Sequence, residues 1–294
     1  GDRAIEDVAD DYYKELMDRN LLQAVPDYFE DWGCRMHDVV RELALYVSQH
    51  KHLYHQDAST ARHRHLTIVG EVASTVLEIN KKNECLRALL LSKNPSIKSI
   101  PSDFFGKVRC LRVLDLTYTG IESLTDSVGC LVHLRFLNVS FTELDELPES
   151  IQNLRNLQTL KANGCKFLHR LPKGLVRLHK LTHLSIADTQ LDKMPIGLEE
   201  LKSLHTLYGF VANDENQGDN NMKELWNLTQ LRRLTMHKLE AVADKAQAEE
   251  AGLKNKSDLK YLRLSCTRKT NRNQLEDPEI QKIEEVFEGL LPPS

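Results

Sequence analysis

Residues 111–139 read LRVLDLTYTGIESLTDSVGCLVHLRFLNV, and this stretch decides the fold because its two ends carry one pattern. Leucine or another apolar residue fills the first, fourth and sixth places of both LRVLDL and LRFLNV. The last two of these anchors are two residues apart, so both point to one face of a short strand. The residue between them points to the opposite face. The spacing therefore predicts a strand at each end of the stretch and a return segment between them.

The same six-residue pattern recurs along most of the chain, with its leading leucine at positions 86, 111, 134, 157, 181, 204, 231 and 259. The intervals are 25, 23, 23, 24, 23, 27 and 28 residues, which fit the spacing of leucine-rich repeats. One repeat cannot bury its apolar edge alone, whereas stacked repeats bury a continuous core. We therefore predict an α/β fold: a leucine-rich-repeat solenoid, or horseshoe, with a parallel sheet on its concave face.

The turn after each strand carries a small, weakly polar residue at an equivalent place: Thr119, Thr142, Cys165 and Thr189. We expect these side chains to sit inside the turns and to bond backbone groups that have no partner in the sheet. The return segments carry a second apolar anchor, which is followed by proline in copies such as Leu147-Pro148 and Leu171-Pro172. Proline limits regular helix to the residues after it.

The amino-acid composition is typical of a folded protein and says little about which partners it binds. The 294 residues are 41% hydrophobic and 28% charged, and the net charge is −4. This charge is too near neutral to argue for nucleic acid or an anionic membrane as partner, and no apolar run is long enough for a membrane span. The six cysteines are scattered without a C-x-x-C pair. We therefore expect reduced, buried thiols and no disulfide framework.

The residues before the repeats follow other patterns. Residues 5–21 have apolar positions at helical spacing, 21–25 and 33–37 look like short strands, and 38–49 again favour a helix. Helix, hairpin and helix predict the C-terminal part of a winged-helix subdomain over residues 1–49. Residues 50–63 are a polar linker, and residues 64–294 are the leucine-rich-repeat domain, which we expect to be truncated at its C-terminus because no polar cap is evident.

These segments, in this order, closely resemble one known family. DVADDYYKELMDRNLLQ, CRMHDVVRELALYVS and RHRHLTI precede the repeats, and the whole arrangement resembles plant intracellular nucleotide-binding leucine-rich-repeat disease resistance proteins of the coiled-coil class found in grasses. The resemblance covers essentially the whole chain. It implies a part of an innate immune receptor, from the end of its winged-helix subdomain into its repeats. The repeats of this family sense a pathogen effector and hold the receptor inactive.

In this family a Met-His-Asp motif closes the nucleotide switch, and Met36, His37 and Asp38 match it. The resemblance implies that His37 contacts an ADP phosphate in the full receptor and that Asp38 holds the local fold. The residues alone leave a second interpretation, a helix-capping Asp beside an incidental His. The phosphate loop G-x-x-x-x-G-K-[ST] is missing, so we expect ADP or ATP in the full-length receptor and no cofactor in this chain by itself.

The alternation of the strands predicts which side chains project from the concave face. They are Val113, Asp115, Phe136, Asn138, Thr159, Lys161, His183, Ser185, Thr206, Tyr208, Arg233, Thr235, Tyr261 and Arg263, with Tyr118 and Phe141 as further exposed aromatic residues. Aromatic residues and arginine are common at the centres of protein interfaces. The face is thus a candidate protein-binding surface, with a merely solvated face as the alternative.

Two further groups of basic residues could be either ordinary solvated residues or binding sites. His50, His52, His55, His63 and His65 form a histidine-rich stretch, but no Cys or carboxylate completes a tetrahedral site, so we expect a solvated linker and no metal. Arginines recur at repeat-locked places, where they are ordinary surface residues or a stripe that docks an acidic domain. They are Arg109, Arg112, Arg135, Arg155, Arg177, Arg232 and Arg233.

No catalytic motif is present, and we predict that the chain is not an enzyme. The resemblance implies as partners a pathogen effector or a guarded host protein, and the receptor's own nucleotide-binding domain. It implies no nucleic acid, oligomers only on activation of the full receptor, and a cytoplasmic location with nuclear shuttling or plasma-membrane association on activation. The alternative function is a stand-alone leucine-rich-repeat scaffold that binds proteins without a nucleotide switch.

Overall fold

The computed structural model describes residues 5–19, 21–25, 33–36, 52–54, 65–67, 86–213, 221–267 and 277–292. The chain divides into two compact units, Gly1–His52 and Leu53–Ser294. Each unit has its own pattern of secondary structure. No helix among the described residues is both long and apolar enough to cross a membrane.

The first unit begins with a helix that is followed by a hairpin. Helix α1 spans Ile5–Asp18, strand β1 spans Leu22–Val25 and strand β2 spans Gly33–Met36. The two strands pair antiparallel, with Leu22 opposite Met36 and Val25 opposite Gly33. The predicted helix and the two predicted strands are therefore confirmed. The predicted helix at residues 38–49 lies outside the described residues.

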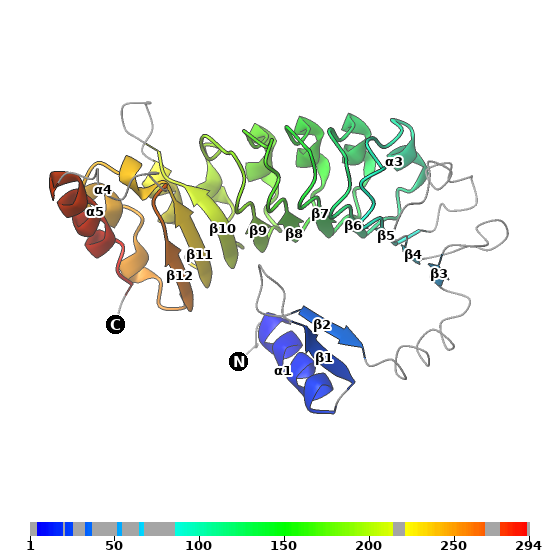
Figure 1. Ribbon diagram of the computed structural model, residues 1–294, viewed down its shortest axis with the longest axis horizontal. Helices are drawn as coiled ribbons and strands as arrows, with labels where there is room; N and C mark the ends of the chain where they lie inside the picture. Colours follow the sequence, from blue (N-terminus) through cyan, green and yellow to red (C-terminus); the bar gives the residue numbers. More distant parts are fainter. Residues whose placement is uncertain are drawn as a thin grey trace. The chain divides into compact units, whose positions relative to one another are not determined.

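The second unit is built on one sheet. Within the described residues it has ten strands in the order β12-β11-β10-β9-β8-β7-β6-β5-β4-β3, and Figure 1 shows β5 to β12 side by side along one face. The bounds are β3 His52–Tyr54, β4 His65–Thr67, β5 Ala88–Leu90, β6 Val113–Asp115, β7 Phe136–Asn138, β8 Thr159–Lys161, β9 His183–Ser185, β10 Thr206–Val211, β11 Arg233–His237 and β12 Tyr261–Leu264. Every pair from β4 to β12 is parallel. The predicted repeat solenoid is confirmed.

The return segments carry short helices on the side away from the sheet (Figure 1). They are α3 Phe104–Lys107, η3 Asp126–Cys130, η4 Glu149–Asn153, η5 Lys173–Arg177, η6 Leu198–Glu200, η8 Asn221–Leu225, η9 Leu239–Ala241 and η10 Leu253–Asn255, the η segments being 3-10 helices. Pro148 and Pro172 stand directly before η4 and η5 in extended backbone. Proline thus ends the extended part of the repeat and fixes where the single helical turn begins.

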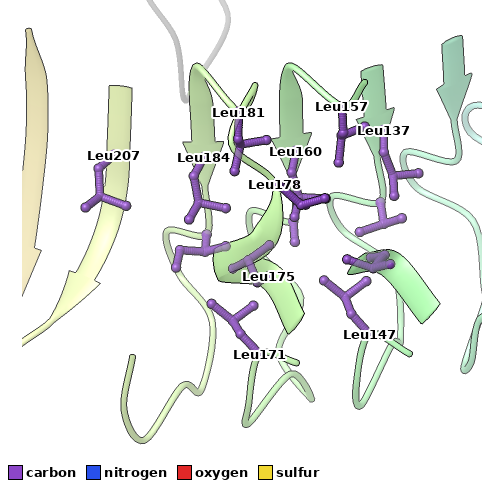
Figure 2. Close-up of a cluster of buried hydrophobic side chains, with 14 of the residues drawn as sticks. Leu137, Leu147, Leu157, Leu160, Leu171, Leu175, Leu178, Leu181, Leu184 and Leu207 are labelled. Atoms are coloured by element: carbon purple, nitrogen blue, oxygen red, sulfur yellow. The ribbon is translucent and has the colours of Figure 1, made fainter. Parts of the chain in front are cut away.

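Leucines from successive repeats form continuous buried columns between the sheet and the return segments. Figure 2 shows Leu137, Leu160, Leu184 and Leu207 side by side on neighbouring strands, and each is fully buried. Each repeat therefore covers the apolar edge of the previous one. At about 1.5–3 kcal/mol for each buried leucine side chain, these columns supply most of the stabilisation.

The turns after the strands are closed as predicted. The hydroxyls of Thr119 and Thr142 donate to the carbonyls three residues earlier at 2.7 Å, and Thr189 does the same at 2.9 Å. The Cys165 thiol lies 3.1 Å from the carbonyl of Val139 in the preceding repeat, and burial raises its pKa.

The prediction of buried thiols is wrong for Cys110 and Cys130, which are exposed and unpaired, because both precede strands at solvent-facing positions.

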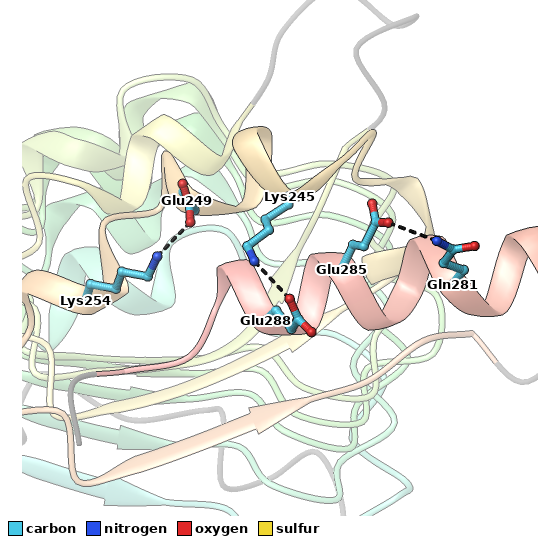
Figure 3. A network of polar contacts seen from close by, with 6 residues as sticks. All are labelled: Lys245, Glu249, Lys254, Gln281, Glu285 and Glu288. Carbon is cyan, nitrogen blue, oxygen red and sulfur yellow. Dashed lines mark hydrogen bonds and ion pairs between the residues drawn. The ribbon is translucent and has the colours of Figure 1, made fainter.

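The last repeat is covered by two helices. Helix α4 spans Lys245–Glu249, and the amphipathic helix α5 spans Asp277–Gly289. The α5 side chain Val286 and the following Leu290 are fully buried in the core. Lys245 of α4 and Glu288 of α5 form an ion pair of 2.9 Å (Figure 3). Helix α5 is therefore packed onto the last described repeat.

One position of the leucine columns holds a charged residue. In sequence, Leu253, Lys256 and Leu259 repeat the spacing of Leu175, Leu178 and Leu181, so Lys256 replaces a core leucine. Its side chain is buried at 2% exposure. The ammonium donates to the carbonyls of Leu225 at 2.8 Å and Leu228 at 3.0 Å. Burial lowers the pKa of Lys256 to about 8.

Replacing Leu178 by Ala should lower the free energy of unfolding by about 2–5 kcal/mol, because the cavity opens inside a column that cannot collapse. Urea unfolding followed by far-UV circular dichroism measures the change. The half-buried Val176, two residues earlier on η5, is the matched control, and Val176→Ala should cost distinctly less. Equal losses for the two variants would contradict the buried columns as the main source of stability.

Replacing Lys256 by Met should raise the free energy of unfolding by about 1–3 kcal/mol at neutral pH, because an apolar side chain of similar length needs no desolvation of a charge. The unfolded chain holds the Lys256 proton up to about pH 10.4, whereas the folded protein releases it from about pH 8. The native protein should therefore gain stability relative to the variant as the pH rises through this window. Parallel urea midpoints of the two proteins across this range would contradict the assignment.

Candidate protein-binding face

The sheet register brings the predicted surface residues into two rows on the concave face. One row is Val113, Phe136, Thr159, His183, Thr206, Arg233 and Tyr261, and the other is Asp115, Asn138, Lys161, Ser185, Tyr208, Thr235 and Arg263. Between the rows runs the fully buried column that contains Leu114, Leu160 and Leu234. Alternation along each strand explains this arrangement, because neighbouring side chains point to opposite faces.

Two residues of the second row do not project as the sequence predicts. Ser185 is 3% exposed and Thr235 is 7% exposed. The Ser185 hydroxyl donates to Asn163 at 2.7 Å, and the Thr235 hydroxyl accepts the backbone N–H of Gly209 at 2.7 Å. Both side chains are short, and their polar atoms are used within the fold. They therefore fall outside the candidate binding surface.

Asp115 and Asn138 are half-buried and partly engaged by their own turns. The Asp115 carboxylate accepts the backbone N–H of Thr117 at 2.9 Å, and the Asn138 side chain accepts that of Ser140 at 3.0 Å. Such contacts two residues along the chain satisfy turn amides that the sheet does not pair. Asp115 and Asn138 therefore stabilise the turns that border the concave face.

Tyr208 and Tyr261 meet across strand β11. Their strands, β10 and β12, are separated by β11, a span of about 10 Å at normal strand spacing. The ring centroids are nevertheless 6.1 Å apart, with the rings at 75° to each other. The two rings therefore lean toward each other across β11. Tyr261 remains 45% exposed, so the pair presents an aromatic surface to solvent.

A histidine pair continues this surface toward the middle of the sheet. The rings of His183 and His205 lie edge to face with centroids 6.3 Å apart, and His183 Nδ1 is 3.0 Å from the Thr206 hydroxyl. His205 directly precedes β10 and was not among the residues predicted for the face. Its place in the repeat, one residue before the strand, is the signal that would have found it.

The remaining predicted residues differ in exposure. Arg233 and Arg263 are exposed, while Val113, Phe136, Thr159, Lys161, Thr206 and Tyr208 are half-buried. The part of the face formed by β9 to β12 therefore combines aromatic rings, histidines and two guanidinium groups. Large rings and guanidinium groups with restricted freedom are suited to burial against a protein partner.

Tyr118 and Phe141 lie in the turns after β6 and β7 instead of on the strands. Their rings stack in parallel, with centroids 4.5 Å apart and an interplanar angle of 4°. Both residues have left-handed backbone, with φ of 56°, as does Gly164 at the equivalent place of the next repeat, with φ of 66°. A Cβ atom on Gly164 would lie 2.5 Å from the Phe141 ring. Glycine at this place thus lets the aromatic stack form.

The predicted nucleotide-contact motif is only partly described. Met36 ends strand β2, and His37 and Asp38 lie outside the described residues. In the predicted histidine-rich stretch, His52 begins β3 and His65 begins β4, whereas His50, His55 and His63 lie outside the described residues. Among the residues that are described, no group of three or more His, Cys, Asp or Glu side chains is placed to hold a metal ion.

Comparison with protein families gives two matches along the chain. Residues 86–287 match the family described as leucine-rich repeat region. Residues 1–44 match the family described as disease resistance protein winged helix domain. The two matches occur in the order expected from the sequence.

Among similar proteins, disease resistance RPP13-like protein 4 of Arabidopsis thaliana is 28% identical over 90% of this chain and 32% of its own length. Disease resistance protein RPP8 of the same plant is 29% identical over 52% of this chain and 18% of its own length. The chain thus spans about a fifth to a third of the length of such relatives.

Solved structures show the same fold. A leucine-rich-repeat protein of Leptospira interrogans superposes with a TM-score of 0.51 at 23% identity, over 78% of this chain and 60% of that one. The leucine-rich-repeat ectodomain of the Arabidopsis thaliana receptor kinase GASSHO1/SCHENGEN3 gives a TM-score of 0.52 at 16% identity, over 74% and 29%.

Replacing Gly164 by Ala should lower the free energy of unfolding by about 1–3 kcal/mol, because the methyl group meets the Phe141 ring on a strained left-handed backbone. It should also disturb the Tyr118–Phe141 stack, which near-UV circular dichroism reports. Gly106 is the matched control, since a methyl group there would meet no heavy atom within 4 Å. A Gly164→Ala protein as stable as Gly106→Ala would contradict this role.

Proposed function

The chain belongs to the leucine-rich repeat region family, and we propose that it is the sensing part of a plant immune receptor that acts by binding proteins. The single observation that carries this proposal is the order of its two family matches, a disease-resistance winged helix at residues 1–44 and then leucine-rich repeats at residues 86–287. The Arabidopsis relatives, one of which aligns with 90% of this chain, are named as disease resistance proteins. The proposed role is recognition and not catalysis.

The concave face formed by β9 to β12 is the proposed recognition surface. The face-to-edge pair of Tyr208 and Tyr261 and the exposed guanidinium groups of Arg233 and Arg263 favour a protein partner with apolar and acidic groups. A pathogen effector, a guarded host protein and the receptor's own nucleotide-binding domain are the three partners that the family resemblance implies. Contact with the last of these would hold the receptor inactive until another partner displaces it.

The winged-helix segment is proposed to belong to an ADP/ATP switch in the full receptor. Met36 ends the second strand of the hairpin, and His37 would follow it directly, facing the nucleotide phosphates. A switch of this kind works by differential binding, because ADP and ATP stabilise different arrangements of the domains. Oligomers would then form only in the activated receptor, which we place in the cytoplasm.

A stand-alone scaffold is the second candidate, favoured by one observation: the repeats and helix α5 already enclose a continuous core without a nucleotide-binding domain. Coding sequence upstream of Gly1 separates the two functions. A phosphate-loop motif in that sequence supports the receptor, and a start of translation close to Gly1 supports the scaffold.

Replacing Tyr208 and Tyr261 together by Ala should abolish the resistance response of the full receptor while it remains folded, since aromatic anchors at interface centres commonly contribute about 2 kcal/mol or more each. Cell death in leaf tissue that expresses receptor and effector is the readout. Phe167, which is 55% exposed and lies off the concave face, provides the control variant Phe167→Ala. An unchanged response in the double variant would remove these residues from the recognition surface.

Replacing His37 by Ala in the full receptor should reduce its content of bound ADP and cause cell death without effector, because the imidazole no longer donates to the phosphate. Nucleotide released from purified receptor by acid and separated by chromatography measures the first effect. His133, an exposed histidine of the repeats, serves as control through His133→Ala. Unchanged ADP content together with an effector-dependent response would contradict the switch.

A further inference from the structure

The edge of the sheet at which the strands begin is basic, although the whole chain has a net charge of −4. The segments that lead into β6 to β11 contain no Asp or Glu at all. These segments, which we call the entry edge, are residues 107–113, 130–136, 153–159, 177–183, 201–206 and 228–233. Acidic residues gather elsewhere in the repeats, as at Glu143, Asp145, Glu146 and Glu149. The charges are thus separated within the repeats of β6 to β9, whereas Glu200 directly precedes the segment that leads into β10, and Asp258 lies before β12.

An open pocket lies on the entry edge between two successive repeats. Its volume is about 550 Å³, and its lining consists of Gln152, Asn153, Arg155, Arg177, His179 and Lys180. The first three residues come from the end of η4 and the segment after it, and the others from the equivalent end of η5 and the segment after that helix. Three permanent positive charges and one imidazole therefore surround a single cavity that has no carboxylate in its lining.

Amide side chains hold two of these cations in place. Arg177 Nη1 donates to Gln152 Oε1 at 2.7 Å, and Lys180 Nζ donates to Asn156 Oδ1 at 2.8 Å. Asn156 is itself fixed, because its Nδ2 donates to the carbonyl of Val132 at 2.8 Å. Amide oxygens orient the guanidinium and ammonium groups without neutralising them. Each of these hydrogen bonds uses one N–H donor, so most donors of the guanidinium and ammonium groups remain available to an anion.

The cation at the place of Arg177 is not repeated in the two adjoining repeats. The place of Arg177 is occupied by Asn153 in the repeat before and by Glu200 in the repeat after. Glu200 is within ion-pair distance, 4.0 Å, of Lys202, so the next repeat cancels its own positive charge. Sequence periodicity alone does not require this difference, since all these positions face solvent.

We propose that this pocket binds a compact ligand with two or more phosphate groups. Guanidinium groups match phosphate oxygens in paired hydrogen bonds, and an ammonium adds a point charge. Several cations fixed around one cavity favour clustered phosphates over a single carboxylate, because each further phosphate meets a cation that is already in place. The pocket lies on the edge of the sheet and not on the face proposed for protein recognition, so either proposal can fail without the other.

Titration of the 294-residue chain with inorganic tripolyphosphate by isothermal calorimetry tests the proposal. Measurements at about 0.15 M salt screen charges more than about 8 Å apart, so that only a formed site retains affinity. The variant Arg177→Gln/Lys180→Gln should bind at least about tenfold more weakly, since a hydrogen bond to a charged group is commonly worth more than the 1.4 kcal/mol of a tenfold change. Both residues are exposed, and an unchanged thermal midpoint checks that the variant is folded.

The control variant is Lys166→Gln/Lys193→Gln, which removes the same charge from two exposed lysines outside the pocket. Its affinity should change less than about twofold, the effect of distant screened charges. Equal weakening of both variants would overturn the pocket in favour of diffuse attraction, and so would the absence of binding to any phosphate ligand.

Phosphatidylcholine vesicles that carry phosphatidylinositol 4,5-bisphosphate distinguish the source of the phosphates. Co-sedimentation that depends on Arg177 and Lys180, without binding of tripolyphosphate, would support the pocket and assign it to a lipid headgroup. Binding of tripolyphosphate with no vesicle binding would support it and assign a free ligand. Poly-aspartate that binds more tightly than tripolyphosphate through the same two residues would overturn the phosphate ligand and indicate an acidic protein segment.

Discussion

The fold depends on one constraint: each repeat has to bury the apolar edge of the repeat before it. The columns through Leu137, Leu160 and Leu184 are fully buried, and no single repeat could enclose its leucines alone. This constraint fixes the parallel register of the sheet, since a slip by one residue would turn every leucine of a strand to solvent. The turns and return helices then follow, because they must bring the chain back to the same edge after each strand.

The fixed register also assigns every other side chain to a surface. Residues beside the buried column form the concave face, residues before the strands form the entry edge, and residues after the strands form the turns. At the turns one left-handed residue per repeat is needed, which Tyr118, Phe141 and Gly164 supply at equal places. The loss of stability on substitution therefore differs among these turn positions. The Phe141 ring fits at its turn because Gly164, at the same place in the next repeat, has no side chain.

The sequence was sufficient for the repeats, for their register and for the residues inside the turns, because all three follow from spacing. It was insufficient where side chains of different sizes compete for one surface. Ser185 and Thr235 occupy projecting places but are buried, and their hydroxyls form hydrogen bonds within the fold. The approach of Tyr208 to Tyr261 skips a strand, and no periodic pattern predicts a contact across an intervening residue. The pocket beside Arg177 likewise depends on side-chain directions that amide partners set.

Exceptions to the repeat pattern are therefore more informative than the pattern itself. Leucines in the columns explain only stability, whereas the cations around the pocket differ from their equivalents in adjoining repeats without any structural need. Lys256 shows the contrast, because it too departs from the pattern but its ammonium is used up by backbone carbonyls. Arg177 and Lys180 are oriented yet not neutralised. A charged residue that breaks the repeat pattern, and whose charge no group of the fold neutralises, is available to bind a ligand of opposite charge.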